Sequence, residues 1–357
     1  MQRHASSQRA SLLVMPMCAC AQTGRRMKPT STPMNARQIL TISCLLLQAQ
    51  SQAAEWQKLP PLPAPNGGFV VGMDHGKIVI AGGTNWLGGI KNWLKAVHVF
   101  DPQMLAWKTE ADLSAPLAYG ISGLVDDTLV LTGGYTGEKG NSEQLWITNG
   151  KRVVKPGFPV GHASTLAAGG VIGGRMILNG GSPDPASLSQ ASSATWALDS
   201  SGKLEKLADH PGPGYITAAS ATARNQLFVF GGAAWDEKAQ TVMNLDSAHA
   251  FQLASNQWKT LRPLPYSVRG ITGVALNERT IYLAGGYKND AEGFTNEAWF
   301  YDIGQDTYKP APPLPYKAMV SLVVCDDYLY CLGGEDKKQS RTDDCYRVLI
   351  SQMAVFR

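Results

Sequence analysis

The feature that most constrains the fold is a short apolar run ending in two glycines, which recurs six times. The runs are Lys77–Gly83, Thr128–Gly134, Arg175–Gly181, Gln226–Gly232, Thr280–Gly286 and Tyr328–Gly334. Their final glycines follow one another at intervals of 51, 47, 51, 54 and 48 residues. Similarity at a near-constant period indicates a repeat architecture, in which each unit buries its apolar faces against its neighbours.

Each unit shows the same internal order. A short apolar strand and a tight turn precede the diglycine strand, and a variable loop and a third strand follow it. Third strands are expected at Ala96–Phe100, Ala194–Leu198, Ala248–Leu253 and Ala298–Tyr301. In three units an aromatic residue comes seven positions after an aromatic of that strand: Phe100 and Trp107, Phe251 and Trp258, Tyr301 and Tyr308.

This order fits strands arranged around an axis. Glycine pairs permit close backbone approach near the axis, and outer aromatics fill the gap that widens between neighbouring sheets. The units also resemble Kelch repeats, which combine a diglycine with an aromatic–Asp pair and a later Trp or Tyr. We therefore predict an all-β fold, a six-bladed Kelch-type β-propeller with four-stranded blades.

The last unit ends soon after residues 346–350 without an outer strand of its own. The segment 55–63, with sequence EWQKLPPLP, resembles the outer-strand segments at 257–265 and 307–315. We therefore predict that an N-terminal strand, at about residues 55–59, completes the last blade of residues 317–350 and closes the ring. Residues 55–357 are expected to form a single propeller domain.

Residues 34–54 are typical of a secretory signal peptide. Arg37 precedes the apolar run Ile39–Leu47, and small residues follow at Ser51–Ala53. The run is too short to span a bilayer, and the alternative is an internal buried segment. Residues 1–33 are expected to be a non-native upstream leader, and the mature protein is expected in the periplasm.

The charge of the chain lies mainly in this N-terminal part. Residues 1–54 contain six basic residues and no acidic one, so removing them from a net charge of +4 leaves −2. A near-neutral domain gives no argument for a nucleic-acid partner. We expect no membrane association once the signal peptide has been cleaved, and the chain is compatible with a homodimer.

The cysteines and short motifs predict neither a disulfide framework nor a cofactor. Residues 55–357 contain three cysteines, Cys325, Cys331 and Cys345, and an odd number does not form a framework. Cys331 and Cys345 are able to meet across neighbouring strands, but free buried cysteines are the favoured interpretation. No histidine pair has metal-ligand spacing, and no nucleotide-binding loop or nucleophile elbow occurs, so we predict no metal and no cofactor.

Three segments carry a closer family resemblance. They are Gly67–Phe69 through Ala81–Gly83, Ala118–Gly120 followed by Leu131–Gly134, and Gly334–Asp343. The third has Gly-Glu, a five-residue gap and Arg-Thr-Asp, and resembles a motif of the bacterial N-acetylneuraminate epimerases, the sialic acid mutarotases. The order of the blades differs, so the chain is similar to a cyclically permuted branch of that family. A closed ring tolerates permutation because its blade contacts remain intact.

The resemblance implies a catalytic glutamate at Glu335 and a nearby arginine at Arg341. It also implies interconversion of the α and β anomers of N-acetylneuraminate or a related sialic acid. Two arginines of the typical enzyme are missing, because Leu117 occupies the position of one and none occurs near Tyr215. The loss of two cations points to altered recognition of substrate charge.

The residues are compatible with the chemistry that this resemblance implies. Anomer exchange requires removal of a proton from the anomeric hydroxyl and protonation of the ring oxygen, for which a carboxylate and an acid suffice. Glu335 follows a diglycine directly, so it should lie beside the axis as the general base. Arg341 is expected to grip a carboxylate bidentately or to steady charge as the ring opens. The alternatives are a solvated Glu335 and a surface ion pair of Arg341 with Asp343 or Asp344.

Other side chains near the ends of the inner strands are candidates for substrate binding. They are Asn85, Trp86, Tyr119, Tyr135, Trp235, Arg269 and Tyr287. The aromatic rings are expected to stack on sugar faces, and the alternative for each ring is packing between blades.

The leading functional hypothesis is a sugar mutarotase, an isomerase whose partner is a small-molecule sugar. The alternative is a non-catalytic Kelch propeller that binds a glycan or a protein, because a fold does not imply a function. A sialidase is disfavoured, because neither Asp-box repeats nor a three-arginine cluster occurs.

Overall fold

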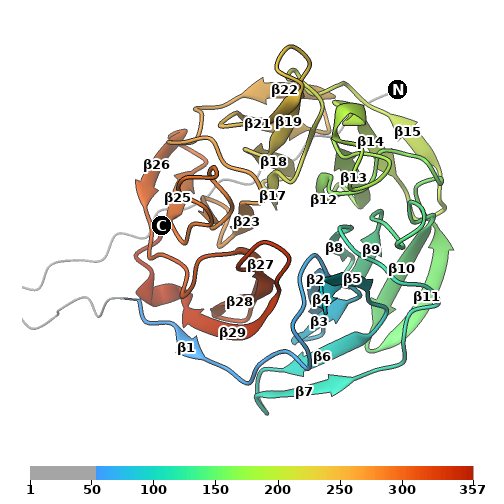
Figure 1. Ribbon diagram of the computed structural model, residues 1–357, viewed down its shortest axis with the longest axis vertical. Helices are drawn as coiled ribbons and strands as arrows, with labels where there is room; N and C mark the ends of the chain where they lie inside the picture. Colours follow the sequence, from blue (N-terminus) through green and yellow to red (C-terminus); the bar gives the residue numbers. More distant parts are fainter. Residues whose placement is uncertain (1–53, 357) are drawn as a thin grey trace, which may run out of the picture. The chain divides into compact units, whose positions relative to one another are not determined.

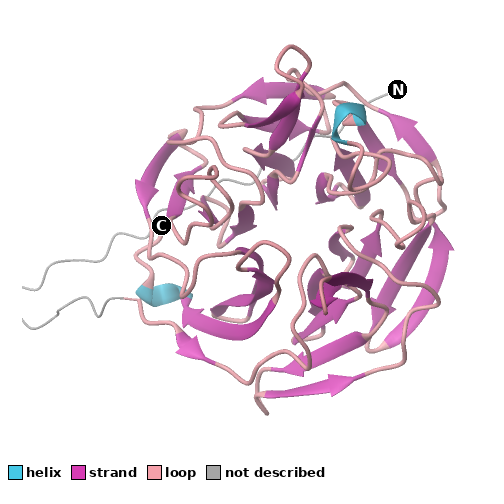
Figure 2. Cartoon of the chain, viewed as in Figure 1, coloured by secondary structure: helices cyan, strands magenta, loops and turns pink. Residues whose placement is uncertain are grey.

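The computed structural model describes residues 54–356, in which strands dominate the regular structure (Figure 2). The predicted leader lies outside the described residues, as does the predicted signal peptide except for Ala54. Two single-turn 3₁₀ helices occur among the described residues, η1 (Leu188–Gln190) and η2 (Ile350–Gln352). Neither helix has the length and apolar character needed to cross a membrane.

Six four-stranded antiparallel sheets correspond to the six diglycine units. The first three are β2 (Val70–Asp74), β3 (Lys77–Ala81), β6 (Val97–Asp101) and β7 (Ala106–Thr109); β8 (Ile121–Val125), β9 (Thr128–Thr132), β10 (Glu143–Thr148) and β11 (Lys151–Pro156); and β12 (Ala168–Ile172), β13 (Arg175–Asn179), β14 (Thr195–Leu198) and β15 (Leu204–Lys206). The other three are β17 (Ala219–Ala223), β18 (Gln226–Phe230), β21 (Ala248–Gln252) and β22 (Gln257–Thr260); β23 (Thr272–Ala275), β24 (Thr280–Ala284), β25 (Ala298–Asp302) and β26 (Thr307–Pro310); and β27 (Met319–Cys325), β28 (Tyr328–Glu335), β29 (Thr342–Leu349) and β1 (Gln57–Lys58). Each predicted third strand agrees with the observed one to within one residue at either end.

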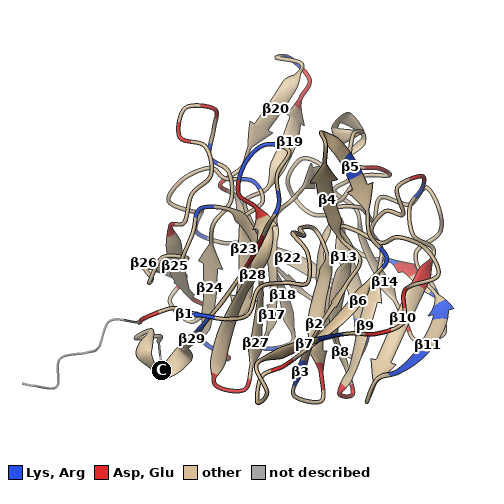
Figure 3. Cartoon of the chain, turned by 60° about the horizontal axis from the view of Figure 1, so that its bottom comes forward, with Lys and Arg blue, Asp and Glu red and all other residues tan. Residues whose placement is uncertain are grey.

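Two elements were not predicted, because the sequence analysis expected only variable loops after the diglycines. One is the hairpin of β4 (Thr84–Leu87) and β5 (Ile90–Trp93). The other is a small sheet of β16 (Tyr215–Ile216), β19 (Ala233–Asp236) and β20 (Thr241–Asn244). Figure 3 shows the hairpins β4–β5 and β19–β20 projecting from the same end of the described unit.

The innermost strands of the six sheets surround a central axis (Figure 1). Each of β2, β8, β12, β17, β23 and β27 contacts the next, and β27 contacts β2. Side-chain hydroxyls link neighbouring inner strands: Ser122 donates to the carbonyl of Val71 at 2.6 Å, and Thr272 donates to that of Val320 at 2.6 Å. The prediction of an all-β propeller is confirmed.

The ring is closed as predicted by the N-terminal strand. β1 pairs antiparallel with β29, with Gln57 opposite Arg347 and Lys58 opposite Tyr346. The indole of Trp56 donates to the carbonyl of Pro313 at 2.7 Å and so ties the same segment to the connector that follows the fifth sheet.

Apolar clusters fill the spaces between neighbouring sheets, one for each neighbouring pair among the described residues. The predicted aromatic pairs occur within them, with ring centroids 4.9 Å apart for Phe100 and Trp107 and 5.1 Å apart for Tyr301 and Tyr308. The cluster between the first and second sheets contains no aromatic residue. There Ile147 lies opposite Arg152, where the first and fifth sheets pair two aromatics.

The three cysteines of the described unit are buried and free, as favoured by the sequence. Cys331 lies opposite Tyr346 and Cys345 opposite Leu332, and the two thiols belong to apolar clusters on different faces of the sixth sheet. Burial raises the pKa of Cys345 to about 12, so its thiol stays protonated and unreactive at neutral pH.

Candidate functional site

The residues that follow the diglycines pair back to the segments that precede the inner strands. Thr84 bridges to Gly67, Tyr135 to Ala118, Ser182 to Thr165 and Tyr287 to Arg269. This pairing draws Thr84 and Ser182 into the interior, where neither is exposed. Among the described residues, Glu335 is the only residue directly after a diglycine that lines the central cavity.

The central cavity, here called the axial mouth, has a volume of about 210 Å³. Its wall consists mainly of the residues at the entry to each inner strand: Gly68, Tyr119, Leu166, Thr217, Gly270 and Met319. The first five have positive φ angles. Their peptides are joined around the ring, for example by the amide of Thr217 donating to the carbonyl of Leu166 at 2.9 Å. A second cavity of about 260 Å³ shares part of this wall and continues along the inner strands.

Glu335 reaches the axial mouth because β28 is unusual among the diglycine strands. The other five end before their diglycine, whereas β28 continues through it to Glu335. Its pairing is irregular between Met319 and Ser321 on β27 and between Leu332 and Gly334 on β28, and such bulges re-aim side chains beside functional sites. Gly334 is required there, because its φ is 111° and a Cβ would lie 2.1 Å from the carbonyl oxygen of Met319.

Arg341 forms an ion pair with Glu335 in the wall of the mouth. Its Nη1 lies 3.0 Å from Oε2 of Glu335, and the arginine side chain is 5% exposed against 30% for the glutamate. Nη1 also donates to the carbonyl of Ser340 at 2.7 Å, and Nη2 donates to Oγ1 of Thr84 at 3.2 Å. Gly67 makes this position possible, because a Cβ there would lie 2.6 Å from Cδ of Arg341.

This geometry differs from the surface ion pair that was the alternative for Arg341. Arg341 is buried rather than at the surface, and its carboxylate partner is neither Asp343 nor Asp344. Asp344 instead pairs with Lys58, at 3.0 Å. Glu335 is partly shielded, lines the cavity and is paired with the guanidinium of Arg341.

Tyr119 is the third predicted residue on the wall of the mouth. Its hydroxyl lies 3.4 Å from Oγ1 of Thr84, so a row of polar groups runs from Glu335 through Arg341 and Thr84 to Tyr119. Sequence reasoning missed the role of Thr84 in this row. A signal was present, because Thr84 follows the first diglycine as Glu335 follows the last.

The β4–β5 hairpin adds an aromatic flank beside Tyr119. The ring of Trp93 lies 5.8 Å from that of Tyr119 and 5.2 Å from that of Tyr135. The ammonium of Lys91 lies 4.6 Å from the ring of Trp93 and 4.9 Å from that of Tyr119. Neither Lys91 nor Trp93 was predicted, because the hairpin itself was not.

The two predicted residues on the same hairpin lie outside the lining of the mouth. Asn85 is buried and accepts a hydrogen bond from Asn92 at 3.1 Å. Trp86 lies opposite Lys91 in the hairpin, and its buried indole nitrogen has no hydrogen-bond partner. Their part in binding, like that of Tyr135, stays a prediction.

A second flank lies on the other side of the sixth sheet. Nη1 of Arg269 donates to Oδ1 of Asn244 at 3.0 Å, and the guanidinium lies 4.4 Å from the ring of Tyr287. The hydrogen bond that Tyr287 donates to Asp290 raises the pKa of the tyrosine. Trp235 stands on the β19–β20 hairpin opposite Val242. None of the predicted residues Arg269, Tyr287 and Trp235 lines the mouth, so their binding roles also stay predictions.

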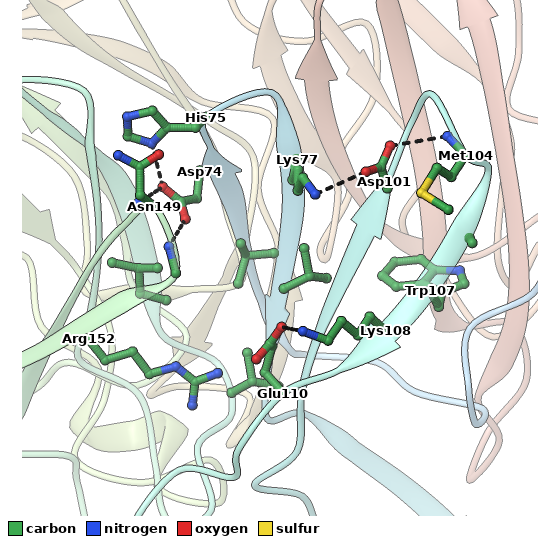
Figure 4. Close-up of a pocket in the computed structure, with 16 residues that line it drawn as sticks. Asp74, His75, Lys77, Asp101, Met104, Trp107, Lys108, Glu110, Asn149 and Arg152 are labelled. Atoms are coloured by element: carbon green, nitrogen blue, oxygen red, sulfur yellow. Dashed lines mark hydrogen bonds and ion pairs between the residues drawn. The ribbon is translucent and has the colours of Figure 1, made fainter.

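A larger cavity, of about 550 Å³, opens between the first and second sheets (Figure 4). Its charged groups neutralise one another, as in the pair of Lys77 with Asp101 at 3.0 Å and that of Lys108 with Glu110 at 2.8 Å. It lies where the aromatic pair is missing, so we interpret it as a packing gap and assign the candidate site to the axial mouth. Among residues 54–356, no group of three or more potential metal ligands occurs.

The ring of four-stranded sheets and the diglycine repeats define a protein of the Kelch-type β-propeller class. No family model matches the chain. It is 31% identical to Kelch-like protein 35 of Mus musculus over 131 residues, which cover 36% of this chain and 21% of that protein. The chain thus spans about a fifth of the length of this curated relative.

The chain also resembles the N-acetylneuraminate epimerases. It is 24% identical to the enzyme of that name from Salmonella enteritidis PT4 over 178 residues, which cover 41% of this chain and 46% of the enzyme. Among solved structures, YjhT shares the fold with a TM-score of 0.63 at 16% identity, covering 80% of this chain and 95% of YjhT. The predicted resemblance to this family is confirmed.

Proposed function

We propose that this protein is a sugar mutarotase that interconverts the α and β anomers of N-acetylneuraminate or a related sialic acid. The observation that carries the proposal is the carboxylate of Glu335 at the axial mouth, held at 3.0 Å by the buried guanidinium of Arg341. The resemblance to N-acetylneuraminate epimerases supports the choice of substrate.

The chemistry follows from this arrangement. Glu335 takes the proton of the anomeric hydroxyl, the bond between the anomeric carbon and the ring oxygen breaks, and the ring oxygen takes up a proton from water. The carbonyl face turns and the same steps in reverse close the ring. Arg341 fixes the orientation of Glu335 and steadies the charge that passes through it, and the hydroxyl of Tyr119 is available to hydrogen-bond the sugar.

The test is an NMR measurement of anomer equilibration after crystalline single-anomer N-acetylneuraminate is dissolved with the purified protein. We expect acceleration over buffer that Glu335→Gln abolishes and that Glu205→Gln, a change of an exposed carboxylate, retains. Acceleration that survives Glu335→Gln would keep the activity and discard this site. No acceleration by the wild-type protein would discard sialic acid as the substrate.

A second candidate function is a non-catalytic Kelch propeller that binds a glycan or a protein. The match to Kelch-like protein 35 favours it, because that identity is higher than the identity to the epimerase. Binding of sialic acid without any acceleration of anomer exchange would support this candidate.

We further propose export to the periplasm through the signal peptide at residues 34–54. Expression of the full chain followed by cell fractionation and N-terminal sequencing tests the proposal. A mature N-terminus near residue 55 in the periplasmic fraction is expected, and an uncleaved protein in the cytoplasm would refute it.

A further inference from the structure

The contacts of Arg341 at the axial mouth already occupy both terminal nitrogens of its guanidinium. Its Nη1 contacts Glu335 and the carbonyl of Ser340, and its Nη2 contacts Thr84. Its Nε has no hydrogen-bond partner but is buried against Gly67, where a Cβ would lie 2.8 Å from it. The positive charge of Arg341 is therefore already balanced by Glu335, and an acidic sugar needs another cation.

Lys91 supplies such a cation beside the mouth. It is half-buried on β5, and its ammonium lies over the rings of Trp93 and Tyr119, at 4.6 and 4.9 Å from their centroids. Tyr119 lines the mouth. No ion pair is formed by Lys91 within residues 54–356, whereas the neighbouring Lys95 pairs with Asp112 at 3.4 Å. Aromatic faces orient the ammonium without neutralising it.

Arg269, on the opposite flank, is less suited to this task. Its guanidinium is tied to Asn244 and stacked on Tyr287, which in turn hydrogen-bonds the carboxylate of Asp290. That carboxylate offsets the positive potential around Arg269, and no comparable carboxylate contacts Lys91 among the described residues. Lys91 is also connected to the pair of Glu335 and Arg341 by successive contacts. Its ammonium lies over the ring of Tyr119, whose hydroxyl contacts Thr84, and Thr84 accepts a hydrogen bond from Arg341.

We infer that Lys91 is a specificity-determining residue that binds the carboxylate of an acidic sugar while Glu335 acts on its anomeric hydroxyl. The inference rests on the proposed function and names the group that selects its substrate class, sugars with a carboxylate beside the anomeric centre. A cation that binds the ground state and the transition state alike changes KM rather than kcat.

The test compares N-acetylneuraminate with its methyl ester, which has the same ring but no charge. Anomer exchange is measured by NMR, and binding of each sugar is measured by calorimetry. We expect Lys91→Met to raise KM and Kd for N-acetylneuraminate about tenfold and to change kcat less than threefold. The methyl ester should be little affected, Lys91→Arg should largely restore the affinity, and the exposed control Lys95→Met should match the wild-type protein.

The outcomes separate this inference from the proposed function. Affinity for N-acetylneuraminate that depends on Lys91, without any acceleration of exchange, would overturn the mutarotase and keep the role of Lys91. Equal loss for both sugars would overturn the charge-recognition role and show that Lys91 only supports the aromatic flank. Unchanged affinity in Lys91→Met, or no binding by the wild-type protein, would also overturn it.

Discussion

Mild acid should destabilise this protein through a pair of buried histidines. His210 and His249 are 5% and 6% exposed, and Nε2 of His210 lies 2.9 Å from Nδ1 of His249. The amide of Gly212 donates to Nδ1 of His210 at 3.0 Å, so neutral His210 carries its proton on Nε2 and donates it to His249. A second proton would have to bind Nδ1 of His210, which is occupied as the acceptor of the amide of Gly212.

The magnitude follows from the pKa of His210. Burial, with a smaller contribution from His249, lowers it from 6.5 to about 3. Below pH 6.5 the imidazole of His210 is therefore protonated in the unfolded chain, whereas in the folded chain it stays neutral down to about pH 3. Stability is full above pH 6.5 and falls with pH in this window by about 1.4 kcal/mol per unit, or about 2 kcal/mol between pH 6.5 and 5. Burial also lowers the pKa of His249, so this residue contributes a further loss of stability as the pH falls.

The assay is urea unfolding at several pH values between 7.5 and 5 for the wild-type protein and His210→Asn. The asparagine retains an acceptor for Gly212 but does not titrate, so the variant should lose about 2 kcal/mol less than the wild-type protein as the pH falls. His98→Asn is the control: burial lowers the pKa of His98 too, but Asp112 offsets the effect, so the control should change the slope less. Parallel pH profiles for the wild-type protein and His210→Asn would refute the reasoning.

Three further predictions concern packing and the mouth. Arg152→Trp should fill the cleft between the first and second sheets and raise the free energy of unfolding by about 1 kcal/mol; unchanged or lower stability in urea would show that the cleft is not a packing gap. Gly67→Ala should displace Arg341 and slow anomer exchange at least tenfold while circular dichroism stays that of the wild-type protein, and full activity would contradict the contact. Thr84→Val should cost about 1–2 kcal/mol in urea unfolding, because it leaves the guanidinium of Arg341 short of an acceptor; no loss would show the hydrogen bond to be dispensable.

The repeat made most of the fold predictable from sequence. Strands of a propeller contact mainly their neighbours in the chain, so periodicity of the diglycines determines the sheets and their order. The closure of the ring by β1 was also predictable from sequence, because the segment around Trp56 resembles the outer strands of other units. The aromatic pairs, such as Phe100 and Trp107, followed from one spacing rule that the second sheet breaks at Arg152.

The candidate site was only partly predictable, because its contacts join distant segments. Glu335 and Arg341 were accessible from a local motif. The hydrogen bond from Arg341 to Thr84 spans 257 positions, and no spacing rule covers it. Lys91 was missed because its direction depends on a hairpin in a loop of variable length, where local composition does not distinguish a strand from a turn.

The candidate site lies where the last sheet, completed by β1, meets the first. A repeat protein offers equivalent positions at every unit, and the wall of the mouth is built from such equivalents, including Gly68 and Gly270. Chemistry on one substrate needs asymmetry, and here it arises where the last sheet bulges at Gly334 and meets the first sheet. The ion pair belongs to the last sheet and the loop within it, and Thr84 and Lys91 belong to the β4–β5 hairpin between β3 and β6 of the first sheet. A permuted ring keeps its blade contacts wherever the chain ends lie, so the local departure of β28 from the repeat at Gly334, rather than the position of the termini, supplies the asymmetry.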